Sequence, residues 1–138
     1  EAADGQLALF FMLMLGGRLS LAFVDLKFIG NRMLLAVSCL SSACLYLGGL
    51  RFSPFLTAWC GLTLAPFFPA LMDEVAHTFG KKAPRAMGTV IGAGNLSIFA
   101  MHLAVGAVTD WLDLSRALLV GPGALALAGM GLLWTRFR

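Results

Sequence analysis

The chain has 138 residues, of which 59% are hydrophobic and only 12% are charged. An ordinary globular domain carries about 25% charged residues, so a soluble fold of this length could not hide this much apolar surface from water. The net charge of +3 is small and is spread over several short segments, which argues against nucleic-acid binding. The composition therefore predicts a polytopic membrane protein.

Five apolar stretches are long enough to cross a lipid bilayer, which takes about 20 residues of helix. They cover residues 7–24, 33–50, 54–72, 87–108 and 114–134. None shows the alternating pattern of a membrane β-barrel strand, and in lipid a helix satisfies its own backbone polar groups. We therefore expect an all-α transmembrane bundle of five spans, with membrane lipid around it and no soluble domain.

The basic residues predict how these spans are oriented. Seven of them fall on one face of the membrane: Lys27, Arg32, Lys81, Lys82, Arg85, Arg136 and Arg138. Only Arg51 and Arg116 fall on the other face. Because cytoplasmic loops carry the excess of Lys and Arg, the C-terminus is expected in the cytoplasm, in an inner or plasma membrane of bacterial type.

The chain opens on Glu1 without an initiator methionine or a basic leader, which predicts a portion of a longer protein. Cys39, Cys44 and Cys60 lie inside apolar stretches and form no CxxC pair. We interpret these cysteines as small buried hydrophobic residues rather than as metal or redox ligands.

A stripe of small and polar residues runs along the fourth apolar stretch, which has no charged residue between positions 88 and 108. It consists of Gly88, Gly92, Asn95, Phe99, His102 and Gly106. At 100° per residue these positions share one helix face, which we call the polar stripe. The opposite face carries Val90, Ser97, Met101, Ala104 and Val108, which suits lipid or an apolar partner.

Two interpretations of the polar stripe remain open. In the first, Gly88, Gly92 and Gly106 let another helix approach closely, and Asn95 and His102 only form hydrogen bonds with that neighbour. In the second, the stripe faces a water-filled pathway, and Asn95 or His102 contacts a solute or relays protons.

Other polar residues and prolines inside the apolar stretches are further candidates. Arg18 in the first stretch needs water, a carboxylate or backbone carbonyls, and Asp25, seven residues later, lies on the same helix face. Pro66 and Pro69 remove backbone donors and predict a bend in the third stretch, and Pro122 predicts another in the fifth.

Enzymatic chemistry finds little support in the sequence. Asp73 and His77 have the i, i+4 spacing of a metal or proton-relay pair, but a solvated helix end explains them as well. No nucleophile, zinc, phosphate or dinucleotide motif occurs. We expect no enzyme, no cofactor and no bound metal; an intramembrane enzyme using Asp73, Glu74 and His77 is the weakest of the alternatives.

Three segments of the sequence resemble the major facilitator superfamily of transporters, in particular its fucose-permease-like sugar branch. They are "LFFMLMLGGRLSLAFVDLKFIGNRMLL" for the eighth helix and its loop, "GLTLAPFFPALMDEVAHTFG" for the tenth, and "AMGTVIGAGNLSIFAMHLAVGAVTDWLDLSRALL" for the eleventh and the start of the twelfth. The family's loop signature is eroded. Asp25 is kept, Leu21 replaces a glycine, and Lys27, Gly30 and Arg32 are out of register.

The resemblance implies the last five helices of a twelve-helix alternating-access transporter, with the missing N-terminal helices of the same transporter as partners. It places Arg18, Phe67, Asn95, Phe99 and His102 along the substrate pathway, and Asp25, Lys27 and Arg32 at a cytoplasmic gate. The expected function is secondary transport of a small polar solute, such as a sugar or another metabolite. The alternative is a non-transporting membrane subunit that uses the polar stripe for assembly.

Overall fold

The computed structural model describes residues 2–23, 30–111 and 113–136. Within these ranges all regular structure is helical, which confirms the all-α prediction for the described part of the chain. The helices are α1 (Ala2–Phe23), α2 (Asn31–Arg51), α3 (Phe55–Leu64), α4 (Phe67–Phe79), the 3₁₀ turn η1 (Gly80–Lys82), α5 (Ala83–Trp111), α6 (Leu114–Ala117) and α7 (Val120–Arg136).

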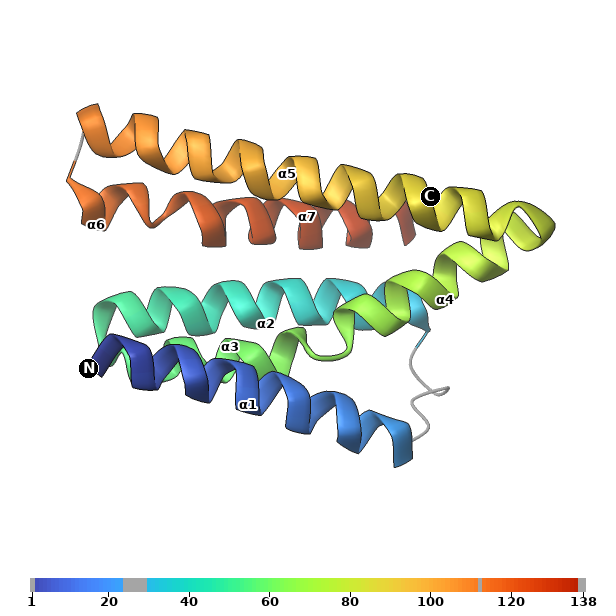
Figure 1. Cartoon of the computed structure of the whole chain (residues 1–138), viewed down its shortest axis with the longest axis horizontal. Coiled ribbons are helices and arrows are strands. Elements are labelled where there is room, and N and C mark those ends of the chain that lie inside the picture. Colours follow the sequence, from blue (N-terminus) through green and yellow to red (C-terminus); the bar gives the residue numbers. More distant parts are fainter. Residues whose placement is uncertain (1, 24–29, 112, 137–138) are drawn as a thin grey trace.

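The long helices lie roughly along one axis, and successive ones run in opposite directions (Figure 1). Three apolar helical stretches are long enough to cross a membrane: Gly5–Phe23, Asn31–Arg51 and Phe55–Trp111, while Val120–Trp134 is shorter. The stretch from Phe55 to Trp111 reverses direction at η1, so that α5 runs back beside α7 (Figure 1). These lengths and compositions are compatible with an integral membrane protein.

The third predicted span is divided into α3 and α4, and the break lies at Ala65 and Pro66. Pro66 has no N–H to donate, so the i→i−4 bond to Leu62 is lost; the Ala65 N–H instead donates to the Leu62 carbonyl over 3.3 Å. Pro69 takes the third position of α4, where a missing N–H costs nothing. Pro66 therefore lies in the break between the two helices, and Pro69 lies in the first turn of α4.

The turn between α4 and α5 requires a glycine. Gly80 has φ 49° and caps the C-terminus of α4, and within the described ranges it is the one residue with a positive φ. A side chain at this φ is strained, whereas glycine adopts it freely. The chain can therefore reverse within η1.

In the fifth stretch the helix is interrupted at Leu118 and Leu119, between α6 and α7. This interruption precedes Pro122, which becomes the third residue of α7. Pro122 thus lies in the first turn of α7, a position that prolines commonly occupy in helices, and the predicted bend lies a few residues before it.

The core of the bundle is built around α2, which packs against α3, α4 and α7, while α1 packs on α3. The buried face of α2 consists mainly of small residues: Leu35, Ala36, Ser38, Cys39, Ser42, Ala43 and Gly49. Small side chains let helix backbones approach closely in a membrane, where dispersion contacts replace the hydrophobic effect between helices. Cys39 and Cys60 are buried as predicted, but Cys44 is exposed, because it lies on the outer face of α2.

Four glycines mark close helix contacts, and one of them is Gly49 on α2, where an added Cβ atom would collide with the Thr57 side chain on α3. A Cβ atom added at Gly61 on α3 would collide with the backbone carbonyl of Phe10 on α1. One at Gly17 would lie 2.6 Å from the Ala65 Cβ, and one at Gly129 on α7 would lie 2.8 Å from the Leu40 Cγ. A larger residue at Gly61 or Gly17 would require a helix to shift, whereas one at Gly129 would first displace the Leu40 side chain.

Candidate functional site

A cluster of polar side chains joins the N-terminus of α2 to the middle of α4. The Asn31 amide donates to the Asp73 carboxylate over 2.6 Å, and the Arg32 Nε donates to the Glu74 carboxylate, also over 2.6 Å. His77, one turn further along α4, has its Nε2 atom 3.5 Å from Asp73. We call these five residues the α2–α4 cluster.

Helix geometry explains why the α2–α4 cluster forms. Helix α2 begins at Asn31, two residues before the predicted span, so Asn31 and Arg32 belong to its first turn. A helix N-terminus carries partial positive charge, which favours a nearby carboxylate such as that of Asp73. Three residues were predicted at the cytoplasmic gate, and Arg32 is the one that the structure describes. It forms an ion pair with Glu74. Asp25 and Lys27 lie outside the described residues.

The polar stripe lies on the side of α5 that faces away from the bundle. All six stripe residues are exposed, and an added Cβ at Gly88, Gly92 or Gly106 would meet nothing within 4 Å in the described chain. The less exposed residues of α5 include Val90, Ala104 and Val108, which lie on the opposite, apolar face. The apolar face of α5 therefore packs against the bundle, and the polar stripe points away from it.

His102 has a defined hydrogen bond on the polar stripe. Its Nδ1 atom lies 2.8 Å from the carbonyl oxygen of Ile98, one turn back on the same helix. Because a carbonyl only accepts, Nδ1 carries the proton, and in the neutral ring Nε2 keeps a lone pair. That nitrogen can accept a hydrogen bond from a hydroxyl group or take up a proton.

Arg18 and Phe67 do not join the polar stripe. Arg18 is exposed on α1, beside the buried Gly17, and its predicted ion pair with Asp25 falls outside the described residues. Phe67 is half-buried at the start of α4, directly after the break at Pro66. Of the five predicted pathway residues, the structure therefore brings only Asn95, Phe99 and His102 together on one face.

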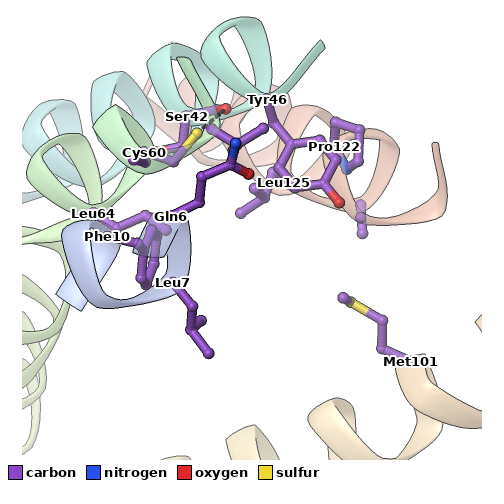
Figure 2. A pocket seen from close by; sticks show the side chains of 14 residues that line it. Gln6, Leu7, Phe10, Ser42, Tyr46, Cys60, Leu64, Met101, Pro122 and Leu125 are labelled. Carbon is purple, nitrogen blue, oxygen red and sulfur yellow. Dashed lines mark hydrogen bonds between the residues drawn. The ribbon is translucent and has the colours of Figure 1, made fainter. Parts of the chain in front are cut away.

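A cavity of about 620 Å³ lies between α1, α2 and α3 on one side and α5 and α7 on the other. Its walls are mainly apolar; Gln6, Ser42, Tyr46 and Thr57 bring the polar groups. Figure 2 shows Gln6 and Tyr46 reaching into this cavity, with Met101 of α5 standing across the open space. The cavity lies toward the end of the bundle opposite the α2–α4 cluster, since Gln6 is in the first turns of α1 and Tyr46 is near the end of α2.

None of the five predicted pathway residues lines this cavity. Gln6 and Tyr46 are not among the predicted residues, although each is a polar residue within or beside an apolar stretch, and the pairing of Asn31 and Arg32 with α4 is not predicted either. Gln6 and Tyr46 have the same sequence feature that identified Asn95 and His102, which is a polar side chain in or next to an apolar stretch. The pairing with α4 depends on helix packing that spacing along the chain does not reveal.

A polar contact inside the core ties α2 to α3. The fully buried Ser42 hydroxyl lies 2.7 Å from the Thr63 hydroxyl, which itself donates to the Cys60 carbonyl over 3.1 Å. Ser42 is therefore the donor of this pair, and the Cys60 thiol returns a bond to the Ser42 carbonyl at 3.4 Å. Inside a lipid bilayer, where water is absent, hydrogen bonds between polar side chains help to hold neighbouring helices together.

We expect Thr63→Val to destabilise the bundle by about 1 kcal/mol, because it leaves the buried Ser42 hydroxyl without its acceptor. Thermal unfolding in detergent measures this, and Ser41→Ala is the control, since the Ser41 hydroxyl bonds only to carbonyls of its own helix. A double variant with Ser42→Ala should recover part of the loss. Purely additive effects would contradict the contact.

Comparison with known proteins gives no match to this chain among family models, curated sequences or solved structures.

Proposed function

We propose that the chain is the C-terminal portion of a secondary transporter of the major facilitator type, which moves a small polar solute such as a sugar through an alternating-access cycle. In this proposal α1, α2, α3 with α4, α5 and α7 each cross the membrane, giving five spans. The membrane is an inner or plasma membrane of bacterial type, with the C-terminus in the cytoplasm.

The observation that carries the proposal is the outward position of the polar stripe. Asn95 and His102 lie in a 21-residue segment, 88–108, that carries no charged residue, and both are exposed on the side away from the bundle. A polar group facing lipid is unfavourable, so this face requires water, solute or protein against it. Its aromatic member, Phe99, is 61% exposed and offers a surface on which a sugar ring can pack.

The break in the third span supports the proposal of a helix that moves during transport. Helix α4 is joined to α3 through the break at Ala65 and Pro66, and its far half is held to α2 by Asn31 and Arg32. A hinge of this kind, with polar contacts that can open, suits a helix that changes its angle during a transport cycle.

Cysteine accessibility tests the pathway assignment in the membrane-embedded protein. In a Cys44→Ala background, Asn95→Cys and His102→Cys are expected to react with an aqueous thiol reagent, and addition of the transported solute should slow the reaction. Val90→Cys and Ala104→Cys are the controls on the opposite face and should stay unreactive. Labelling of the controls with protection of Asn95 and His102 would show that the assignment is wrong.

The competing function is a non-transporting membrane subunit whose polar stripe binds a neighbouring protein. The absence of close contacts at Gly88, Gly92 and Gly106 within the described chain leaves room for such a neighbour. Replacing Asn95 and His102 by leucine distinguishes the transporter from the non-transporting subunit. Lost assembly with normal transport kinetics in the remaining protein favours the subunit, whereas normal assembly with impaired transport favours the transporter.

A further inference from the structure

A group of positive charges lies on the turn between α4 and α5. Lys81 and Lys82 form the end of η1, and Arg85 lies in the first turn of α5. All three residues are exposed, and within the described part of the chain none of them makes a hydrogen bond or an ion pair. We call these three residues the basic turn.

The spacing of the basic turn brings its charges close together. Arg85 follows Lys81 by four positions and Lys82 by three, and η1 leads into α5 at Ala83 without a break. Residues at these spacings are neighbours on a helix, and like charges there repel one another. An anion placed between the side chains would remove this repulsion.

The acidic residues of α4 do not supply that anion. The Asp73 carboxylate accepts a hydrogen bond from Asn31, and the Glu74 carboxylate forms an ion pair with Arg32. Glu74 also precedes the start of the basic turn by about 10 Å at 1.5 Å per residue, which is a full Debye length at moderate salt. The complementary negative charge therefore comes from outside the described chain.

The basic turn lies at the level of the lipid headgroups when α5 spans the membrane. The uncharged segment 88–108 is about 32 Å long, close to the hydrocarbon thickness of a bilayer, so Arg85 lies about 5 Å outside that layer. Figure 1 shows the turn extending beyond the ends of α1 and α2, which leaves it accessible. The preceding Phe79 is 51% exposed, and aromatic residues are common at membrane interfaces.

An anionic phospholipid fits these observations better than a soluble anion does. Side chains as exposed as these do not shield a small anion from water, so they hold it only weakly. A lipid phosphate, by contrast, is kept at the right depth by its acyl chains, and an anionic surface presents many such phosphates at once. Each Lys or Arg near such a surface adds about a fivefold preference for it.

We propose that Lys81, Lys82 and Arg85 bind the phosphates of anionic phospholipids in the leaflet at this end of the bundle, and that they thereby select these lipids from the surrounding membrane. The inference rests on the membrane placement given under the proposed function. It does not rest on transport, and it concerns the choice of lipid rather than the rate of solute uptake.

Fluorescence quenching by brominated lipids tests this contact in the whole protein, reconstituted into vesicles of phosphatidylglycerol and phosphatidylcholine. Phe79→Trp places a reporter beside the basic turn, with every other tryptophan replaced by phenylalanine. The matched control keeps only Trp111, which is 88% exposed at the other end of α5. Bromine is carried near the glycerol of one lipid or of the other, at a constant ratio of the two.

The Phe79→Trp reporter should prefer phosphatidylglycerol over phosphatidylcholine by at least about fivefold, the effect of one cation near an anionic surface. The Trp111 reporter should show no such preference, because Asp110 and Asp113 lie beside it in the sequence. Replacing Lys81, Lys82 and Arg85 together by glutamine should bring the preference at Phe79→Trp close to one. Lys81→Arg with Lys82→Arg keeps the charges and should keep the preference.

The glutamine variant should still fold, because the three residues are exposed and unbonded within the described chain, and circular dichroism checks its helix content. Three results would overturn the proposal: equal quenching by the two lipids at Phe79→Trp, an equal preference at Trp111, or a preference that survives in the glutamine variant.

Inorganic phosphate separates a lipid from a free anion. If phosphate abolished the preference while chloride at the same ionic strength did not, the basic turn would be a site for a soluble anion, and the proposal would be wrong. Quenching does not require transport, so a protein that shows the preference without solute uptake would refute only the proposed function.

Discussion

Gly61→Ala is expected to destabilise the folded bundle by about 1–3 kcal/mol, the usual cost of overpacking a core. The new methyl group would meet the backbone carbonyl of Phe10, which cannot rotate away as a flexible side chain can. Helix α1 must therefore shift from α3 and lose contacts along its length. The midpoint of thermal unfolding in detergent measures the loss.

Gly16→Ala is the matched control for this experiment. An added Cβ at Gly16 would meet nothing within 4 Å in the described chain, although the adjacent Gly17 faces Ala65. Alanine in a helix interior is more favourable than glycine by about 0.5–1 kcal/mol, so this variant should be neutral or more stable. If Gly61→Ala behaved like Gly16→Ala, the close crossing of α1 and α3 would be wrong.

If the chain is part of a transporter, as proposed above, Glu74→Arg is expected to lower the initial rate of solute uptake several-fold. The substitution removes the acceptor of the Arg32 guanidinium and places two positive charges together, so α4 is pushed away from α2. An exposed ion pair contributes only about 0–1 kcal/mol, so the protein should still fold. Solute uptake into reconstituted vesicles is the measurement.

The exchange variant, Arg32→Glu with Glu74→Arg, should recover much of the lost rate, because the pair is restored with its charges swapped. Lys82→Glu is a control that reverses an exposed charge on η1 near the same end of the bundle. Failure of the exchange to recover any activity, with normal amounts of protein in the membrane, would show that the ion pair is not what matters at Glu74.

The sequence predicts the helices well because apolar length and proline position are local properties. Within the described residues, each of the five apolar stretches falls mostly on one helix or on a pair of helices, and Pro66 lies where the third stretch breaks. The apolar stretches do not mark the helix ends. Helix α4 continues beyond residue 72 to Phe79, because Asp73 and Glu74 are polar but compatible with a helix, and Gly80 caps it.

The contacts between helices were harder to predict, because a glycine has the same local pattern whether or not another helix approaches it. Gly88, Gly92 and Gly106 share one face of α5 and yet contact no other helix in the described chain. Gly61 and Gly129 form close contacts without any conspicuous spacing. The polar stripe itself follows from helical periodicity, but what covers it depends on neighbours that periodicity does not specify.

The contact of Gly129 with Cys39 and Leu40 also constrains the order in which the molecule is assembled. Gly129 follows Leu40 by 89 positions, from 129 minus 40, so α7 leaves the ribosome after the other helices of the described chain. Until α7 has been made, the inner face of α2 lacks its contact with Gly129. A nascent chain that stops before α7 should therefore remain loosely associated and be an early target for membrane proteases.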